Sequence, residues 1–276
     1  MSEPFGSLAP TAAQERFRAL GHRLPKNYFG RKAASALLGP AGGRARRAYD
    51  VTIFGTQRAR LHPYDNICEK RVYLTPQLWD APERALLADL ISGFAGRTFH
   101  FVDAGANVGL YTLFARAEAL RAGAAFNVLC IEADPDMQER LAFNLDASAA
   151  SGEVRVSRCA VAGVEGKLRF SVNARSRGES RIDAAGGVEV AARRLQTIVA
   201  EAGFPEIDAM KMDVEGAEFP ALEAFFAEAP KALWPRLLIL ETSHEAPGKS
   251  ASACCSAAGY GLKLKTRMNA VLVLNG

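Results

Sequence analysis

The chain has 276 residues, of which 49% are hydrophobic and 23% are charged, and its formal net charge is +4. These values are ordinary for a soluble globular protein, and the scattered cysteines, with no C-x-x-C pair, argue against a disulfide scaffold and a cysteine zinc site. No run approaches about 20 apolar residues and the first ten residues do not resemble a secretory signal, so we expect a cytoplasmic protein without a transmembrane helix.

The first 78 residues are predicted to form a basic N-terminal extension. Helical spacing is weak around residues 12–20 and 31–38, so we expect a loosely organised cap there, while residues 49–54 and 57–61 predict a small β-hairpin. Basic residues outnumber acidic ones throughout the extension. We favour a solvated face over contact with a membrane surface or an anionic substrate. Nucleic acid is not expected as a partner, because aromatic residues do not alternate with the basic ones.

The second region, residues 79–276, opens within a helix predicted over residues 78–94. Strands and helices then alternate. Strands are predicted at 99–102, 127–132, 154–156, 167–172, 188–192, 207–214, 237–241, 261–266 and 270–274, and helices from 109 and at 135–145, 195–201, 217–227 and 252–258. This alternation predicts an α/β, doubly wound, mostly parallel sheet with helices on both faces and one antiparallel strand from the C-terminal hairpin. Ligands of such sheets lie at the carboxyl ends of the strands.

A glycine turn follows the first strand of this region. Gly105 and Gly109 permit a sharp turn and a close approach of the backbone to a ligand. A dinucleotide site would require G-x-G-x-x-G, but Asn107 stands where the second close glycine would be. Asp103, just before the turn, would repel a pyrophosphate. A carboxylate there suits the amino group and the sulfonium of S-adenosylmethionine.

Carboxylates stand at the ends of four predicted strands. Acids avoid burial unless they are paired, so we expect these side chains to share one polar site. The four residues are Asp103, Glu132, Asp213 and Glu241. Glu132 lies one strand-helix-strand unit after Asp103, where an acid accepts hydrogen bonds from both ribose hydroxyls of an adenosine group. Asp134 is expected to cap the following helix, whose first position is Pro135.

Candidate catalytic residues follow the strand predicted over residues 207–214. Lys211 and Asp213 point to one face of an extended strand, and a buried lysine requires an acidic partner. The pair is either structural or places a base beside a hydroxyl group. Asp213 and His244 are the two candidate bases. Asp213, Glu241 and His244 are also ligand types for a divalent metal. We expect no metal site, but the sequence leaves open whether the reaction uses a divalent metal.

A resemblance to a known family rests on several of these segments. The sequence Ile-Asp-Ala-Met-Lys-Met-Asp-Val-Glu-Gly-Ala-Glu at residues 207–218 resembles the signature of the FkbM-like family of S-adenosylmethionine-dependent methyltransferases. The turn at residues 101–112 resembles the cofactor loop of the same family. The order and spacing of the pieces agree from about residue 80 to the C-terminus. Further matching segments lie at 131–135, 144–145 and 238–241.

The resemblance implies a seven-stranded, Rossmann-like class I methyltransferase fold and O-methylation of a sugar, glycolipid or secondary metabolite. It implies cofactor contacts by Asp103, Gly105, Asn107, Gly109, Glu132, Ala160 and Asp213, and catalytic positions beside the transferred methyl at Lys211, Asp213 and Glu215, with His244 as the other candidate base. The sequence departs from the family at residues 78–83 and 178–181, where members often carry a Tyr-Glu pair and a serine pair. Because both places can touch substrate, the acceptor stays open, as does the oligomeric state.

We therefore predict an S-adenosylmethionine-dependent O-methyltransferase that acts on a small-molecule or glycan acceptor. An NAD-dependent oxidoreductase is one alternative. A non-catalytic cofactor-binding protein with a basic tail is the other, and the intact set of Asp103, Glu132 and Asp213 weighs against it.

Overall fold

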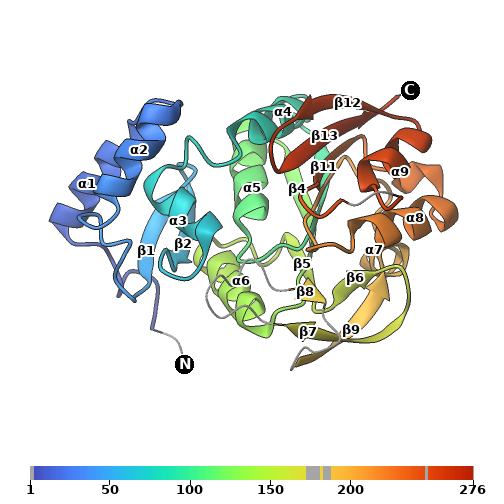
Figure 1. The fold of residues 1–276 in the computed structure, drawn as a ribbon, viewed down its shortest axis with the longest axis horizontal. Helices are drawn as coiled ribbons and strands as arrows, with labels where there is room; N and C mark the ends of the chain where they lie inside the picture. The colour runs from blue at the N-terminus through green and yellow to red at the C-terminus, as the bar shows by residue number, and fades with distance from the viewer. Residues whose placement is uncertain (1–2, 172–180, 183–187, 246–247, 276) are drawn as a thin grey trace.

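The computed structural model describes residues 3–171, 181–182, 188–245 and 248–275 (Figure 1). Its centre is a seven-stranded sheet in the order β12-β13-β11-β10-β3-β4-β5. The run β11-β10-β3-β4-β5 is parallel, and β13 is antiparallel to both of its neighbours, so the predicted doubly wound sheet with one antiparallel strand is confirmed. The strands are β3 (Thr98–Ala104), β4 (Ala125–Ile131), β5 (Val154–Ser157), β10 (Ala209–Met212), β11 (Leu237–Glu241), β12 (Tyr260–Lys265) and β13 (Asn269–Leu274).

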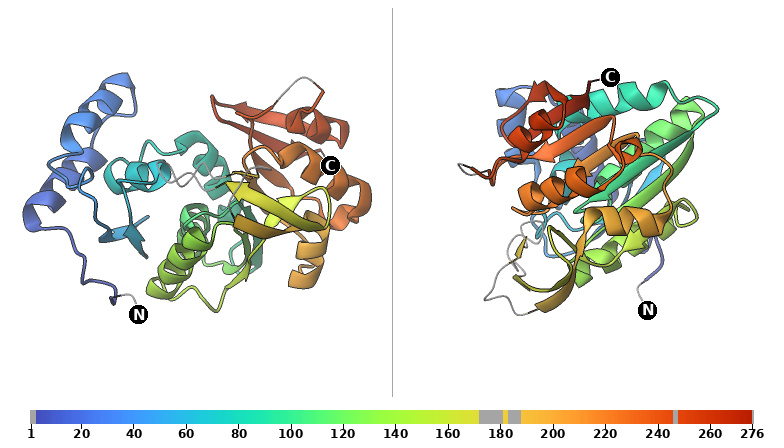
Figure 2. Two further views of the ribbon diagram at one scale, coloured as in Figure 1. Left: turned by 60° about the horizontal axis from the view of Figure 1, so that its bottom comes forward. Right: turned by 90° about the vertical axis from the view of Figure 1, so that its right-hand side faces the viewer.

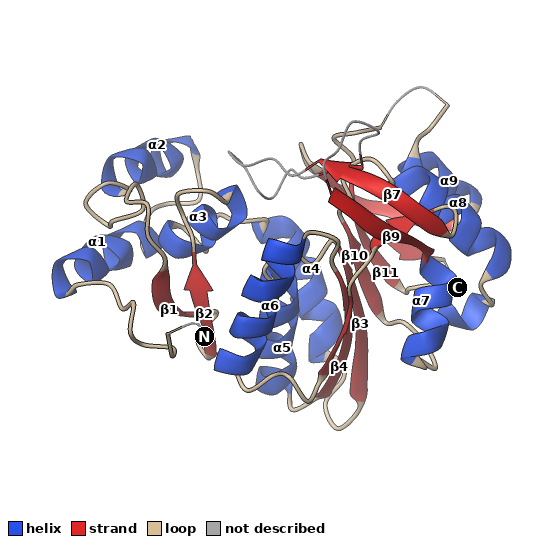
Figure 3. Ribbon diagram, turned by 90° about the horizontal axis from the view of Figure 1, so that it is seen from below, coloured by secondary structure: helices blue, strands red, loops and turns tan. Residues whose placement is uncertain are grey.

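Helices cover both faces of this sheet (Figure 3). On one side lie α4 (Ala81–Ser92), α5 (Leu110–Ala122) and α6 (Pro135–Ala147), and on the other lie α7 (Leu195–Ala202), α8 (Glu218–Glu228) and α9 (Ala251–Ala257). Alternate side chains of β3 enter the two cores: Phe101 packs in the cluster that contains α5 residues, and Val102 packs in the cluster that contains α8 residues. Burial on both faces explains why the central strands are almost continuously apolar.

The N-terminal extension lies at one end of the molecule, blue in Figures 1 and 2. The two helices and the hairpin expected there are confirmed, whereas α3 was not predicted. The expectation of loose organisation for residues 1–48 was wrong, because Ala41 is fully buried in the same hydrophobic cluster as Phe101 of the sheet, and Phe17 packs against that cluster. Tyr49 and Tyr73 are fully buried in this cluster as well, with ring centroids 5.1 Å apart. The elements are α1 (Ala12–His22), α2 (Tyr28–Leu37), β1 (Tyr49–Ile53), β2 (Gln57–Leu61) and α3 (Ile67–Leu74).

The basic side chains of the extension are mostly exposed, but two of them are structural. Arg60 is buried and its Nε lies 2.7 Å from Asp50 Oδ1. Arg18 is also buried, and its Nε donates a hydrogen bond to the Tyr73 carbonyl at 3.1 Å. Part of the positive charge therefore belongs to the core of the extension. Within the described residues, no helix has both the length and the apolar character required to cross a bilayer.

A second, smaller sheet follows the order β6-β9-β7-β8. Its strands are β6 (Ala160–Ala162), β7 (Gly166–Ser171), β8 (Arg181–Ile182) and β9 (Val188–Arg194), and a short 3₁₀ helix, η2, spans Lys231–Leu233. β7 and β9 were predicted, whereas β6 and β8 are too short to give a clear pattern in the sequence. Residues 178–180, where the sequence departs from the FkbM-like pattern, lie outside the described residues.

Candidate functional site

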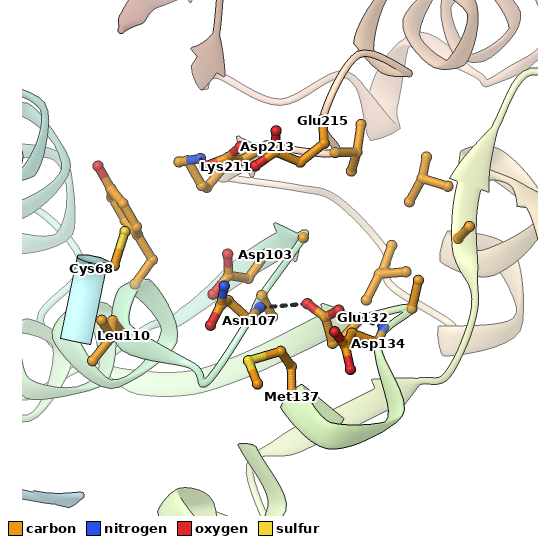
Figure 4. A pocket seen from close by; sticks show the side chains of 18 of the residues that line it. Cys68, Asp103, Asn107, Leu110, Glu132, Asp134, Met137, Lys211, Asp213 and Glu215 are labelled. Carbon is orange, nitrogen blue, oxygen red and sulfur yellow. Dashed lines mark hydrogen bonds and ion pairs between the residues drawn. The ribbon is translucent and has the colours of Figure 1, made fainter. Parts of the chain in front are cut away.

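One pocket opens where the chain leaves β3, β4 and β10 at their carboxyl ends (Figure 4). The lining also includes Cys68 of α3, Trp79 and residues of β6. Of the predicted site residues, eight line this pocket: Asp103, Gly105, Asn107, Glu132, Ala160, Lys211, Asp213 and Glu215. Gly109 and His244 stand outside this lining.

The turn after β3 is held by backbone geometry. Gly105 has a φ of 76°, and a Cβ at this position would lie 1.8 Å from the Asp213 carbonyl oxygen, so a larger residue does not fit. Asn107 has a φ of 52°, a left-handed conformation that asparagine tolerates better than most residues. A Cβ at Gly109 would lie 2.6 Å from Leu141 Cδ1, so this glycine lets the turn pack against α6.

Asp103 is buried at the end of β3, with 1% of its surface exposed. Its Oδ2 accepts hydrogen bonds from the backbone N–H of Thr112 at 3.1 Å and from the Thr112 hydroxyl at 2.7 Å. Burial raises the pKa of Asp103 to about 6, although both Thr112 hydrogen bonds favour the carboxylate. The first turn of α5 therefore fixes an acid that gains from a cationic ligand.

Glu132 joins the turn after β3 to the turn after β4. Its Oε2 accepts a hydrogen bond from the Asn107 N–H at 2.6 Å, and its Oε1 accepts one from the Asp134 N–H at 2.8 Å. Burial raises the pKa of Glu132 to about 7. Each oxygen keeps a second lone pair that can accept a hydrogen bond from a ligand. Asp134 caps α6 by accepting from the Asp136 N–H, as predicted.

The expected pair of Lys211 and Asp213 is present at the end of β10. Lys211 Nζ donates to Asp213 Oδ2 at 2.9 Å, and the lysine is 3% exposed. Burial opposes the charge on Lys211, but the neighbouring Asp213 carboxylate overrides it and raises the lysine pKa. Lys211 also stands beside Asp103 in the sheet register and lies 5.4 Å from the centre of the Tyr111 ring. The lysine thus neutralises part of the acidic charge of the pocket.

Glu215 and His244 meet at the edge of the pocket. His244 Nε2 lies 2.9 Å from Glu215 Oε2 and 3.8 Å from Glu241 Oε2. Burial and the charge of Asp213 raise the pKa of Glu215 to about 7, and the same two causes raise that of Glu241 to about 7. The strand was predicted to reach residue 214 but ends at Met212. The chain then turns sharply, and Glu215 in this turn has a left-handed φ of 54°. These three residues sit on neighbouring strand ends.

The sequence patterns did not assign a role to Asp80, which also lines the pocket. Asp80 has a φ of 39° and accepts a hydrogen bond from the Tyr111 hydroxyl at 3.1 Å. Burial raises the pKa of Asp80. Asp80 belongs to the segment 78–83, where the sequence departs from the FkbM-like pattern. That departure was the only feature of the sequence that pointed to Asp80, because no sequence pattern indicates a left-handed backbone at an aspartate before a helix.

Comparisons with known proteins agree with this architecture. A family model described as the methyltransferase FkbM domain matches residues 103–253, which include the turn after β3, the end of β4 and the Lys211–Asp213 pair. No curated protein matches the chain.

Among solved structures, an FkbM methyltransferase from Methylobacillus flagellatus KT is 17% identical over 75% of this chain and 55% of its own, with a TM-score of 0.45. The chain thus spans about half the length of that protein. The methyltransferase domain of METTL16 is 14% identical over 99% of both chains, with a TM-score of 0.48. TrmK from M. capricolum, solved with S-adenosylhomocysteine, is 8% identical over 68% of this chain and 66% of its own, with a TM-score of 0.39. On the family match, which covers more than half of its residues, the chain belongs to the FkbM methyltransferase family.

Proposed function

We propose that this chain transfers a methyl group from S-adenosylmethionine to a hydroxyl group of a sugar, glycolipid or secondary metabolite. The observation that carries the proposal is that Asp103, Glu132 and the Lys211–Asp213 pair, from three strand ends, line one pocket. Family membership supports methyl transfer. The choice of a hydroxyl acceptor rests on the carboxylate that stands ready to accept a proton.

The charge and the lining residues of the pocket support the choice of this cofactor. Gly105 lets the turn after β3 pack directly against the Asp213 carbonyl at the pocket, and Asp103 supplies negative charge for the cationic methionine end. Glu132 keeps free lone pairs for the two ribose hydroxyls. Ala160, between the buried Cys159 and Val161, offers an apolar wall for adenine. When bound, the cofactor supplies an electrophilic methyl group, which an acceptor oxygen takes as the carbon–sulfur bond breaks and its electron pair stays on sulfur.

In this proposal the chain aligns the acceptor and removes its proton. Asp213 has a side chain that is 37% exposed, and its carboxylate accepts the proton that the acceptor hydroxyl gives up. Lys211 holds that carboxylate in place through the 2.9 Å contact. Glu215 and His244 lie beside Asp213 on the acceptor side, and Asp80 lines the pocket near Tyr111. Alignment of two reactants supplies a large share of the rate in such reactions.

The function is tested with labelled S-adenosylmethionine and a panel of nucleotide sugars, glycolipids and hydroxylated metabolites. We expect label to enter at least one hydroxyl acceptor with the wild-type protein and to be lost with Asp213→Asn. Label that enters only amine or thiol acceptors would refute O-methylation. If the protein binds the cofactor but no acceptor in the panel takes up label, the result would favour the alternative of a non-catalytic cofactor-binding protein.

Cofactor affinity is expected to depend on pH through Asp103 and Glu132. Both groups bind this ligand as carboxylates, and their pKa values are raised from 3.8 to about 6 and from 4.5 to about 7. Affinity should therefore rise from pH 5 to about pH 7 and level off within about one pH unit above it. Because these carboxyl pKa values are higher in the folded chain than in the unfolded one, the free protein should lose stability as the pH rises from about 4 to about 7. Calorimetry across this range measures both trends, and affinity that falls with increasing pH would contradict the assignment.

Asp80 is expected to affect the acceptor rather than the cofactor. Asp80→Asn keeps the size of the side chain but removes the charge, and we expect the acceptor KM to rise by about tenfold, the cost of one hydrogen bond to a charged group. The cofactor Kd should not change. Tyr111→Phe, which removes the hydroxyl that donates to Asp80, should give a smaller change in the same direction. A changed cofactor Kd with an unchanged acceptor KM would show that Asp80 contacts the cofactor and not the acceptor.

A further inference from the structure

Three potential metal ligands converge beside the acceptor side of the pocket. Glu215 comes from the turn after β10, Glu241 ends β11, and His244 lies in the loop that follows. One ligand atom from each lies within 4.8 Å of the other two. Figure 4 shows Glu215 next to Asp213 at the edge of the pocket. The cluster thus combines two carboxylates with an imidazole at neighbouring strand ends.

Glu241 provides an independent sign that a ligand belongs here. Only 7% of it is exposed, and its Oε2 has no hydrogen-bond partner within the described part of the chain. Its Oε1 is occupied by the Ser243 hydroxyl, and His244 Nε2 is 3.8 Å from Oε2, which exceeds hydrogen-bond distance. A buried carboxylate oxygen without a donor is costly. A cation between Glu241 and His244 would satisfy it.

The neighbouring acids are already occupied, which separates them from this cluster. Both oxygens of Glu218 accept backbone hydrogen bonds, from Val214 at 2.8 Å and from Gly216 at 2.9 Å. These bonds hold the turn that presents Glu215. Asp213 forms an ion pair with Lys211. In the described part of the chain, Glu215 and Glu241 form ion pairs with His244. Among the residues that the structure describes, the cluster is therefore rich in negative charge and has no ion pair with a lysine or arginine.

We propose that Glu215, Glu241 and His244 bind a divalent cation of the Mn²⁺ type, which holds the oxygen of the acceptor. Carboxylates suit Mn²⁺ and Mg²⁺, whereas an imidazole disfavours Mg²⁺ relative to transition metals. Three protein ligands leave coordination positions open for water and a hydroxyl group. The sequence grouped Asp213 with Glu241 and His244, whereas the structure groups Glu215 with these two residues, and in the proposed function Asp213 accepts the proton. The acceptor role rests on the proposed function; the ion site itself does not.

Manganese binding tests the site without cofactor, acceptor or turnover. The full chain is stripped with a chelator and titrated with Mn²⁺, with free ion followed by electron paramagnetic resonance. We expect one ion per chain, with binding weakened by at least about tenfold in Glu241→Gln and in His244→Ala. Glu206→Gln is the matched control, because His100, Glu206 and Asp208 form another cluster of ligand types, and this variant should bind Mn²⁺ as the wild type does.

Two further measurements separate the ion site from the proposed function. The cofactor Kd of His244→Ala should match that of the wild type, which also shows that the variant folds. No Mn²⁺ binding by the wild type, or binding unchanged in both cluster variants, would overturn the ion site even if the cofactor binds. Loss of binding in Glu206→Gln alone would overturn it as well. Failure to bind the cofactor, with manganese binding intact, would overturn the proposed function and leave the ion site standing.

Discussion

Replacing Asp213 by asparagine is expected to lower kcat by about 10²- to 10⁴-fold, which is the range for removal of a positioned general base. The cofactor Kd should stay within about twofold, since Asp213 acts on the acceptor. Asparagine is preferred to alanine because its Oδ1 can still accept the hydrogen bond from Lys211, which is 3% exposed and costly to leave unpaired. Single-turnover methyl transfer with labelled cofactor measures the effect.

The control for this variant is Asp89→Asn, since Asp89 is exposed on α4 and does not line the pocket. It should retain wild-type activity. Full activity in Asp213→Asn would show that another group takes the proton. A loss of cofactor binding equal to the loss of activity would instead make Asp213 part of the cofactor site.

Replacing Glu132 by alanine is expected to weaken cofactor binding by about 10²-fold, because two hydrogen bonds from ribose hydroxyls to a charged group contribute about 1.5–3 kcal/mol each before local rearrangement. Adenosine alone, which carries the ribose but no methionine end, should lose affinity by a similar factor. Calorimetry or competition binding with both ligands measures the two losses. A thermal melt checks that the turns at Asn107 and Asp134, which Glu132 joins, still form.

Asp103→Asn is the matched variant for the other end of the cofactor. It should weaken S-adenosylmethionine binding but leave adenosine binding unchanged, and Asn Oδ1 can still accept from Thr112. If Glu132→Ala affects S-adenosylmethionine but not adenosine, the ribose assignment is wrong. If Asp103→Asn weakens both ligands equally, the two ends of the cofactor are not separated as proposed.

The parts of the site that the sequence predicted are those set by short-range patterns. The turn after β3 was predicted from a strand pattern that is followed by Gly105 and by apolar residues at helical spacing. The cap of α6 was predicted from Asp134, which stands directly before Pro135. The ion pair of Lys211 and Asp213 followed from period-two spacing and from the cost of an unpaired buried lysine. The mostly parallel sheet with helices on both faces followed from the alternation of strands and helices, whereas the order of its strands comes from the structure.

The parts that were missed depend on contacts between distant segments. Asp80 reaches the pocket because α4 packs beside α5 and the backbone at residue 80 is left-handed, and neither fact is written in a local pattern. The meeting of Glu215 with Glu241 and His244 depends on the sharp turn after Met212, which ends β10 earlier than its apolar run suggested. The N-terminal extension is well packed because its buried residues belong to the same hydrophobic cluster as residues of the sheet. The boundary between the two regions at residues 78 and 79 stays a prediction.

The most direct test of the account is a calorimetric titration of the wild-type protein with S-adenosylmethionine and, separately, with NAD. We expect one S-adenosylmethionine to bind per chain, with affinity that increases up to about pH 7, and no measurable heat from NAD. Binding of NAD without binding of S-adenosylmethionine would contradict the assignment of the pocket that Asp103, Glu132 and Asp213 line.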